Sequence, residues 1–290
     1  MKSGFVPVVG RPNVGKSTLV NALVGAKVAI TSMRPQTTRN TIRGIVDRPD
    51  LQIVLVDTPG IHRPRTALGE RLNALAAGSL AGADVVVFVI EATGKIGPGD
   101  RLIAGRLTAA GLPTVCVVNK VDAARSDEVV ERLALAGEWG FAAYVPVSAT
   151  QGSNLEPLVA EIAALLSEGP RFFPAGMTSD QANEFLIGEI VREKFLDRLR
   201  DELPHSLAVL VADVVAQDNG VTRIDARVLV ERESQKGIVI GKGGSLLAAA
   251  GTEARAELEL RLGTRVHLEL RVTVEKDWQR HPGIVSKLGL

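Results

Sequence analysis

Gly10-Arg-Pro-Asn-Val-Gly-Lys-Ser17 is the stretch of this 290-residue chain that decides its fold. It follows an apolar run at residues 5–9 and precedes a helical pattern at residues 18–24, which places it between a buried strand and a helix. Glycines at this spacing let successive backbone N–H groups cradle phosphate oxygens, and the helix adds the positive end of its dipole. The pattern predicts a phosphate-binding loop, with a ligand-free glycine turn as the alternative.

Two side chains of this loop carry the expected chemistry. Lys16 supplies positive charge to the terminal phosphates of a nucleotide, and the Ser17 hydroxyl suits a Mg²⁺ ion that bridges those phosphates. The loop alone does not distinguish ATP from GTP. Its predicted nucleotide-binding residues are Gly10, Arg11, Pro12, Asn13, Val14, Gly15, Lys16, Ser17 and Thr18.

Two further polar motifs stand where apolar runs end. Residues 51–56 lead into Asp57-Thr-Pro-Gly60, and residues 114–118 lead into Asn119-Lys-Val-Asp122. Ligands of a doubly wound sheet bind outside the carboxyl ends of its strands, so we expect the three loops to converge on one nucleotide. The predicted nucleotide-binding residues of the later loops are Asp57, Thr58, Pro59, Gly60, Ile61, Asn119, Lys120, Val121, Asp122, Ser148 and Ala149.

Asp122 favours guanine over adenine. A carboxylate offers only acceptors, and guanine presents two neighbouring donors, N1–H and the exocyclic amine. Adenine presents an acceptor at N1 and would leave the desolvated carboxylate without its partner. Ser148 and Ala149, which follow the apolar run 143–147, would close the base pocket with backbone N–H groups. The alternative for residues 119–122 is a solvated turn, which the upstream phosphate loop disfavours.

The composition is that of a soluble globular protein, with 46% hydrophobic and 23% charged residues. The length suggests about two domains. No stretch approaches the roughly 18 uncharged apolar residues of a membrane span, and the start lacks the apolar core of a signal peptide. We therefore expect a cytoplasmic protein with no transmembrane segment. We also expect it to be a monomer. The one cysteine, Cys116, lies among valines and is expected to be a small core residue.

Two different patterns of secondary structure divide the chain. In residues 1–167 apolar strand-like runs alternate with helical patterns, which predicts an α/β domain with a doubly wound, mostly parallel sheet. Residues 168–179 contain two prolines and two glycines that break both periodicities, and we interpret them as a linker. Residues 180–290 combine helical spacing with alternating strands and predict a smaller α+β domain with a carboxyl-terminal extension.

Gly241-Lys-Gly-Gly244 interrupts two helical pieces in the second half. A Gly-x-x-Gly loop between two helices is what K-homology modules use to clamp a nucleic-acid backbone, and the order helix, strand, strand, helix, helix, strand matches their second topology, type II. The tetrapeptide is weak by itself, because Gly94/Gly97 and Gly137/Gly140 match it too. Lys242 inside the loop and the flanking helices strengthen the signal at this place.

The charge of the second half does not point to RNA. Residues 180–290 contain 16 Lys and Arg against 18 Asp and Glu, a formal balance of −2. RNA would have to be bound by a local patch, and a structural or protein-docking domain remains the alternative. The predicted RNA-binding residues are Ile240, Gly241, Lys242, Gly243, Gly244, Arg232, Lys236 and Arg255.

The whole set of motifs resembles the bacterial Era family, GTPases with a carboxyl-terminal K-homology domain, over essentially the full length. The resemblance lies in residues 10–17, 35–39 (Pro-Gln-Thr-Thr-Arg), 57–60, 119–122, 148–149, 240–244 and 276–278 (Lys-Asp-Trp). It implies GTP or GDP bound with Mg²⁺, binding near the 3′ end of 16S ribosomal RNA, and action on the precursor of the 30S subunit. It also implies some peripheral association with the inner membrane. The helix after the glycine loop departs from the pattern, because relatives often carry an extra lysine at residues 245–250.

The resemblance also assigns roles at the γ-phosphate. It places Thr38 in a switch loop as a Mg²⁺ ligand, with Asp57 holding the ion through water and the Gly60 N–H contacting the phosphate. Thr37 remains the alternative to Thr38, and an ordinary polar loop the alternative to both. The predicted catalytic set is Lys16, Thr38 and Gly60, and the predicted metal set is Ser17, Thr38 and Asp57.

Ile61 stands where many GTPases place a glutamine that orients the attacking water. An aliphatic side chain cannot orient water, which predicts slow intrinsic hydrolysis stimulated by RNA, a partner or a monovalent cation. K⁺ near Asn13 is one candidate, because this position resembles that of potassium-activated relatives. His62 is a less favoured candidate for positioning water. The rival functions are a non-ribosomal signalling GTPase and a phosphate-loop metabolic kinase.

Overall fold

The structure, a computed structural model, describes residues 1–34, 37–61, 67–200 and 203–288. Its contacts divide the chain into two compact units. The first unit is Met1–Thr31 with Thr38–Asp180, and the second unit is Ser32–Thr37 with Gln181–Leu290. The expected domain limits at 167 and 180 stay predictions. Pro35 and Gln36 of the predicted switch motif, and His62, lie outside the described residues.

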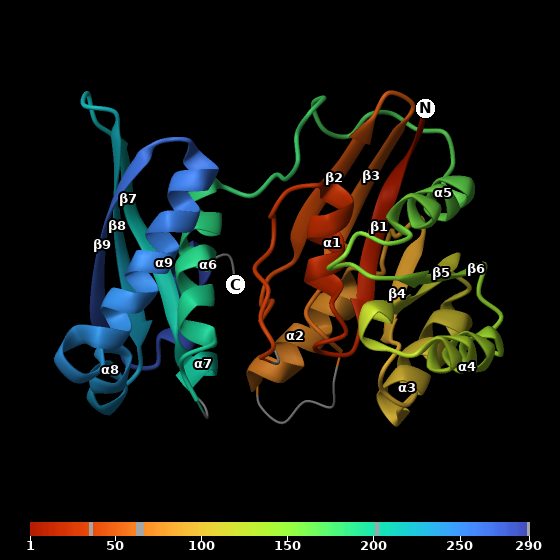
Figure 1. Cartoon of the computed structure of the whole chain (residues 1–290), viewed down its shortest axis with the longest axis horizontal. Helices are drawn as coiled ribbons and strands as arrows, with labels where there is room; N and C mark the ends of the chain where they lie inside the picture. The colour runs from red at the N-terminus through yellow and green to blue at the C-terminus, as the bar shows by residue number, and fades with distance from the viewer. Residues whose placement is uncertain (35–36, 62–66, 201–202, 289–290) are drawn as a thin grey trace. The chain divides into compact units, whose positions relative to one another are not determined.

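A six-stranded sheet forms the centre of the first unit (Figure 1). Its strands are β1 (Lys2–Gly10), β2 (Ile42–Arg48), β3 (Leu51–Asp57), β4 (Val86–Glu91), β5 (Thr114–Asn119) and β6 (Ala143–Val147). Their order is β2-β3-β1-β4-β5-β6, and only the β2/β3 pair among these neighbours is antiparallel. The valine-rich strands suit a sheet whose two faces are both covered, and the predicted α/β fold is confirmed.

Helices pack on the two faces of this sheet (Figure 1). They are α1 (Lys16–Val24), α2 (Ala67–Gly78), α3 (Pro98–Ala110), α4 (Ser126–Gly137) and α5 (Leu155–Leu165), with a short 3₁₀ turn, η1 (Val121–Ala123). Helices α2, α3 and α4 contribute Ala76, Ile103 and Ala136 to an apolar cluster with residues of β1, β4 and β5. Helices α1 and α5 contact each other on the other face. Cys116 is fully buried in the apolar cluster, as expected for a core residue.

Residues 168–180, which we call the strap, are fixed to the sheet of the first unit. At the start of the strap, the Gly169 N–H donates to the Met1 carbonyl (2.9 Å), beside β1. Near its end, the Ile45 N–H of β2 donates to the Thr178 carbonyl (2.9 Å). The prolines and glycines of this segment break helical and strand periodicity, yet its backbone polar groups find partners on the sheet. The segment interpreted as a linker is therefore an ordered part of the first unit.

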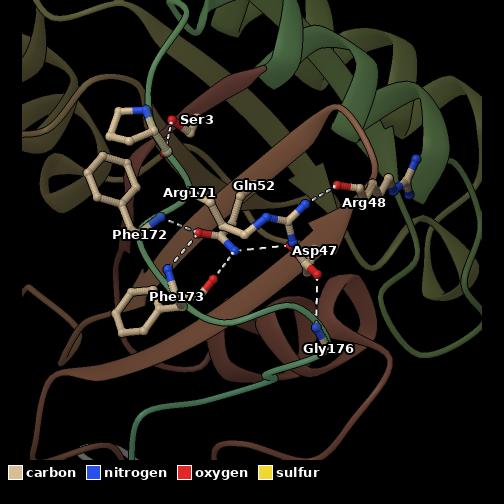
Figure 2. Close-up of polar contacts among 9 residues, drawn as sticks. Ser3, Asp47, Arg48, Gln52, Arg171, Phe172, Phe173 and Gly176 are labelled. Carbon is tan, nitrogen blue, oxygen red and sulfur yellow. Dashed lines mark hydrogen bonds and ion pairs between the residues drawn. The ribbon is translucent and has the colours of Figure 1, made fainter.

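A buried glutamine recognises the middle of the strap (Figure 2). The Gln52 side chain of β3 is fully buried, and its Oε1 accepts from the N–H groups of Phe172 (2.7 Å) and Phe173 (2.9 Å). Its Nε2 donates to the Phe173 carbonyl (3.0 Å) and to Asp47 Oδ1 (3.0 Å). All four hydrogen-bonding positions of the amide are used, so Gln52 binds the strap backbone as completely as its chemistry allows.

Asp47 on β2 holds the strap on either side of this contact (Figure 2). Its Oδ2 accepts from the Gly176 N–H (2.9 Å), and its Oδ1 pairs with the Arg171 guanidinium. The Gly176 N–H, the Gln52 amide and Arg171 together hold the pKa of Asp47 below its ordinary value. The strap also contributes an apolar contact, because the rings of Phe172 and Phe5 lie 4.9 Å apart.

Removing the Gln52 amide should weaken the first unit measurably. In Gln52→Leu the side chain keeps most of its volume, but the N–H groups of Phe172 and Phe173 lose their acceptor. Unpaired polar groups of this kind cost about 1–3 kcal/mol each when buried, and the strap is partly open to water, so we expect a loss of about 2–3 kcal/mol in the free energy of unfolding.

Urea unfolding followed by Trp139 fluorescence, in a Trp278→Phe background, measures this loss. Trp139 lies in the first unit beside Phe88 and reports on it alone once Trp278 is replaced. Gln151→Leu makes the same change at an exposed position of the first unit and serves as the control. Equal unfolding midpoints for the two variants would show that the Gln52 contacts contribute nothing to stability.

The second unit is an α+β domain built on a three-stranded sheet (Figure 1). Its elements are α6 (Asn183–Leu196), α7 (Leu203–Ser206), β7 (Ala208–Ala216), β8 (Val221–Val230), α8 (Glu233–Ile240), η2 (Lys242–Gly244), α9 (Ser245–Leu262), β9 (Arg265–Val274), η3 (Trp278–Arg280) and α10 (Pro282–Lys287). Strand β8 pairs antiparallel with β7 and parallel with β9. The longer helices and the strands follow the order predicted for a type II K-homology domain, and that prediction is confirmed.

One core joins the helices to one face of this sheet. Ile190 of α6, Val239 of α8 and Leu258 of α9 are buried in it together with alternate residues of β8. The carboxyl-terminal extension packs in a separate apolar cluster, where Trp278 is buried beside Leu229. The Trp278 Nε1–H donates to the backbone carbonyl of Ser206 (2.8 Å). Alternation along β8 thus explains why successive residues serve two different apolar clusters.

Candidate nucleotide-binding and RNA-binding sites

Lys16 is a buried cation inside the phosphate loop, 6% exposed. Its Nζ donates to the carbonyls of Arg11 (2.9 Å) and Gly10 (3.3 Å), so the loop backbone curls around the ammonium group. Burial lowers the pKa of Lys16 to about 8, and the nearby Asp57 carboxylate raises it against that effect. A desolvated cation at the start of α1 is well placed to attract phosphate.

Three oxygen-bearing side chains meet beside Lys16. The Ser17 hydroxyl donates to Asp57 Oδ2 (2.6 Å), and the Thr38 Oγ1 lies 2.9 Å from the Ser17 Oγ and 3.4 Å from Asp57 Oδ2. Thr37 does not share this cluster, because its hydroxyl donates to the Arg34 carbonyl (2.7 Å). The geometry therefore favours Thr38 over Thr37, which sequence left open.

Asp57 is fully buried, and burial raises its pKa to about 6, although the hydrogen bond from Ser17 and the charge of Lys16 lower it. Its Oδ1 makes no hydrogen bond within the described residues. An all-oxygen cluster with one uncommitted carboxylate oxygen fits Mg²⁺, which prefers oxygen ligands and binds through one or two carboxylates. The described part of the chain holds no group of three or more His, Cys, Asp or Glu side chains that could bind a metal.

The segment after Asp57 lies against the phosphate loop. The Ile61 N–H donates to the Gly10 carbonyl (3.1 Å), and a side chain at Gly60 would place its Cβ only 2.6 Å from the Pro12 nitrogen. The Ile61 side chain is buried in the apolar cluster of the first unit. Thr58 is also buried, and its hydroxyl donates to a carbonyl of β1, so its side chain faces the sheet. The side chains of Thr58 and Ile61 are therefore both buried in the first unit.

Asn119 joins the phosphate loop to the loop predicted to bind guanine, residues 119–122, which we call the guanine loop. Its Nδ2 donates to the Val14 carbonyl (2.9 Å), and its Oδ1 accepts from the Ala149 N–H (3.1 Å). Asp122 is oriented by the Ser148 hydroxyl, which donates to its Oδ1 (2.6 Å). All three loops predicted to converge are thus joined at one edge of the sheet.

The glycine-rich loop has the backbone that its sequence predicts. Gly241, Gly243 and Gly244 all have positive φ angles, of 75°, 60° and 81°. A side chain at Gly241 would place its Cβ 2.9 Å from the backbone nitrogen of Leu246, in addition to the strain of the left-handed conformation. The sharp turn between α8 and α9 therefore requires glycine here.

The predicted RNA-binding side chains are not all together. Arg232 and Lys242 are exposed at the two ends of α8, and Lys236 is half-buried between them. Arg255 lies ten residues into α9 and so about 15 Å along that helix from the loop. Sequence analysis missed Ile238, which is 54% exposed on α8 and adds apolar surface beside the loop.

Sequence analysis also missed two acidic residues beside the nucleotide loops. Glu91 pairs with Lys120 (2.9 Å), and Asp100 pairs with Arg11 (2.7 Å). Glu91 is the last residue of β4 and Asp100 lies in the first turn of the helix that follows, so the rule that located the other loops would have found this one had it been applied to the apolar run 86–90.

Comparison with known proteins gives matches in both units and over the full chain. The family model described as 50S ribosome-binding GTPase matches residues 5–120, and the KH domain model matches residues 202–279. The chain is 51% identical over 294 residues to GTPase Era of Mycobacterium avium (strain 104), covering 99% of this chain and 98% of that protein. The same identity and coverage hold for GTPase Era of Mycobacterium tuberculosis (strain H37Rv).

Two solved structures resemble the whole chain. One is a tyrosine-to-alanine variant of Aquifex aeolicus Era bound to GDP and AlF₄⁻, with a TM-score of 0.94, 39% identity, and coverage of 100% of this chain and 99% of that one. The other is Era in complex with MgGDPNP and nucleotides 1506–1542 of 16S ribosomal RNA, with a TM-score of 0.92, 40% identity and the same coverage.

Proposed function

The chain belongs to the Era family of GTPases, and from that premise we propose that its second unit binds the 3′ region of 16S ribosomal RNA and acts on the 30S precursor during small-subunit assembly. The first unit is a GTPase. The support for the RNA partner is the left-handed glycine loop between α8 and α9, together with the RNA-bound relative.

We propose that the predicted nucleotide residues act as their positions suggest. Lys16 neutralises phosphate charge, the Gly60 N–H contacts the γ-phosphate, and Asp122 reads guanine. Ser17, Thr38 and Asp57 would hold Mg²⁺, which supplies further charge neutralisation at the terminal phosphates. The support for these roles is the convergence of the three loops, with the buried Lys16 and the Ser17–Asp57 contact at its centre.

Aspartates in the glycine-rich loop should weaken RNA binding strongly. Gly241→Asp combined with Gly244→Asp places two carboxylates where the phosphate backbone would lie, and we expect affinity for a 16S 3′-end fragment to fall about 10- to 100-fold. GDP affinity should stay unchanged. A fluorescence-anisotropy titration measures the first quantity and calorimetry the second.

Gly137→Asp is the matched control, because Gly137 begins another Gly-x-x-Gly pattern at an exposed position. Unchanged RNA affinity in the double variant would contradict this proposal. It would favour the rival function, a GTPase whose second unit docks protein or membrane.

Potassium should accelerate GTP hydrolysis by this protein. We propose slow intrinsic turnover because the Ile61 side chain is buried in the apolar cluster and cannot position water. We also propose a K⁺ site near Asn13, whose left-handed backbone (φ 66°) presents it at the exposed tip of the phosphate loop. We expect single-turnover hydrolysis to be about tenfold faster in K⁺ than in Na⁺. In Asn13→Ala the two rates should be equal.

Fast hydrolysis in Na⁺ that neither K⁺ nor RNA changes would contradict both parts of this proposal.

Resemblance to the family alone supports two further proposals, a monomeric protein and peripheral contact with the inner membrane. Within the described residues no helix has the length and apolar character to cross a bilayer.

A further inference from the structure

The segment from the end of β4 to the first turn of α3 contacts two of the three nucleotide loops. It contributes Glu91, the last residue of β4, and Asp100, the third residue of α3. Asp100 contacts Arg11 in the phosphate loop, and Glu91 contacts Lys120 in the guanine loop. The two acidic side chains touch different nucleotide loops from a single segment of chain.

Asp100 is a buried carboxylate whose two oxygens both accept hydrogen bonds. Its side chain is 1% exposed. Its Oδ1 accepts from the Arg11 Nε–H (2.7 Å), and its Oδ2 accepts from the Gly97 N–H (2.9 Å), which caps α3. A buried charge that lost its cationic partner would be strongly unfavourable, so Asp100 holds Arg11 firmly.

The start of α3 is shaped to receive Arg11. A side chain at Gly99 would place its Cβ 2.9 Å from the Arg11 Cδ. The aliphatic stem of Arg11 thus lies directly over the helix terminus, and its guanidinium reaches Asp100. Geometry and charge fix the same side chain independently, which is more than a surface ion pair provides.

Glu91 holds the guanine loop in a comparable way. Its Oε1 accepts from the Lys120 Nζ (2.9 Å) and from the Thr93 hydroxyl (2.9 Å). Burial raises the pKa of Glu91, but the contacts with Lys120 and Thr93 and the charge of Arg11 outweigh that effect, and the net shift is downward. Lys120 itself has a left-handed backbone (φ 65°), a conformation that costs free energy in a residue other than glycine and needs such support.

We propose that Asp100 and Glu91 are positioning residues for nucleotide binding. Asp100 fixes the start of the phosphate loop through Arg11, and Glu91 fixes the guanine loop through Lys120. Loops held in their binding conformation lose less freedom when the nucleotide enters, so the bound nucleotide stays longer. This inference rests on the proposed nucleotide-binding role of the loops and assigns residues outside them to the same site.

The dissociation rate of GDP tests the proposal. In Asp100→Asn the amide oxygen can still cap α3, but the charge that holds Arg11 is gone. We expect fluorescently labelled GDP to leave the full-length protein about tenfold faster from Asp100→Asn, and several-fold faster from Glu91→Gln, in line with other residues that support a binding site indirectly. If Asp100→Asn fails to fold, Arg11→Gln removes the same ion pair by changing its other partner. The Arg11 side chain is partly exposed, so this change disturbs the core less.

Asp127→Asn is the matched control. It breaks an exposed ion pair of similar length, the 2.8 Å contact with Arg125, on α4 of the same unit. Its GDP dissociation rate should equal that of the wild-type protein. A shared loss of thermal stability without a change in dissociation rate would mean that the acidic residues are merely structural.

A double-mutant cycle separates positioning from general destabilisation. If Asp100 acts through Arg11, the dissociation rate of the Arg11→Gln/Asp100→Asn protein should resemble that of either single variant, and not the product of the two effects. Folded variants that release GDP within twofold of the wild-type rate would overturn this inference alone. A wild-type protein that does not retain GDP at all would overturn the proposed nucleotide roles, and the inference with them.

Discussion

Asp122→Asn should weaken GDP binding about 10²- to 10³-fold, a loss of about 3–4 kcal/mol. Guanine presents two donors to this side chain. An asparagine can accept from only one of them, and its NH₂ group faces the other donor. The Ser148 hydroxyl can still donate to the remaining oxygen, as it does to Asp122 Oδ1 at 2.6 Å, so the orientation of the side chain should survive. The lost affinity is then specific to the base.

The affinity ratio between nucleotides shows this directly. Xanthine carries a carbonyl in place of the guanine amine, so the Asp122→Asn amide can donate to it and xanthosine diphosphate should bind the variant better than the wild-type protein. Calorimetry with GDP, xanthosine diphosphate and ADP measures the ratios, and Asp127→Asn on the surface of α4 is the control. Wild-type protein that binds ATP as tightly as GTP would rule out guanine recognition by Asp122 and would favour the kinase alternative.

Lys16→Met should reduce GDP affinity on the order of 10²- to 10³-fold, because charge-assisted hydrogen bonds to phosphate are worth about 1.5–3 kcal/mol each. The Lys16 ammonium group donates to the carbonyls of Gly10 and Arg11 and is already desolvated. Little further desolvation is needed when phosphate enters, so most of the Coulomb attraction contributes to binding.

The same residue predicts a pH dependence with a definite sign. Burial lowers the pKa of Lys16 from its ordinary value of 10.5 to about 8, so the charged form opposes folding below pH 8 and that cost disappears as the pH rises toward 10.5. Phosphate favours the charged form, so nucleotide binding above pH 8 should take up as much as one proton. GDP affinity should therefore fall by about fivefold between pH 8 and pH 9.

Calorimetry in two buffers with different ionisation enthalpies counts the protons. Guanine N1–H also ionises in alkaline solution, and Lys16→Met, which keeps that contribution and loses the lysine, isolates the effect of Lys16. An equal pH slope in the variant and the wild-type protein would show that Lys16 does not titrate in this range.

The meeting of the three predicted loops at one edge of the sheet could be predicted from sequence because it depends on local chemistry. Gly-Lys-Ser and the two polar motifs after apolar strands determine their own backbone and their place in a parallel sheet. Sequence resemblance favours Thr38 but keeps Thr37 as an alternative, because the distinction depends on which hydroxyl reaches Ser17 when the chain folds back.

The strap and the Glu91–Asp100 segment escaped prediction for a different reason. Their partners lie far away in sequence: Gln52 is 120 residues from Phe172, and Arg11 is 89 residues from Asp100. Contacts between side chains and irregular backbone produce no periodic pattern in the sequence. The prolines and glycines of the strap therefore predict only that helical and strand periodicity ends there.

The pairing of the strap with β2 protects the molecule from self-association. Strand β2 is the outermost strand of its sheet, and Gly44 forms a bridge with Ser179 while the Ile45 N–H reaches Thr178. A strand edge left open offers its free backbone groups to other chains and promotes aggregation. We expect a proteolytic cut followed by loss of the strap to expose this edge of β2 and to lower the solubility of the protein.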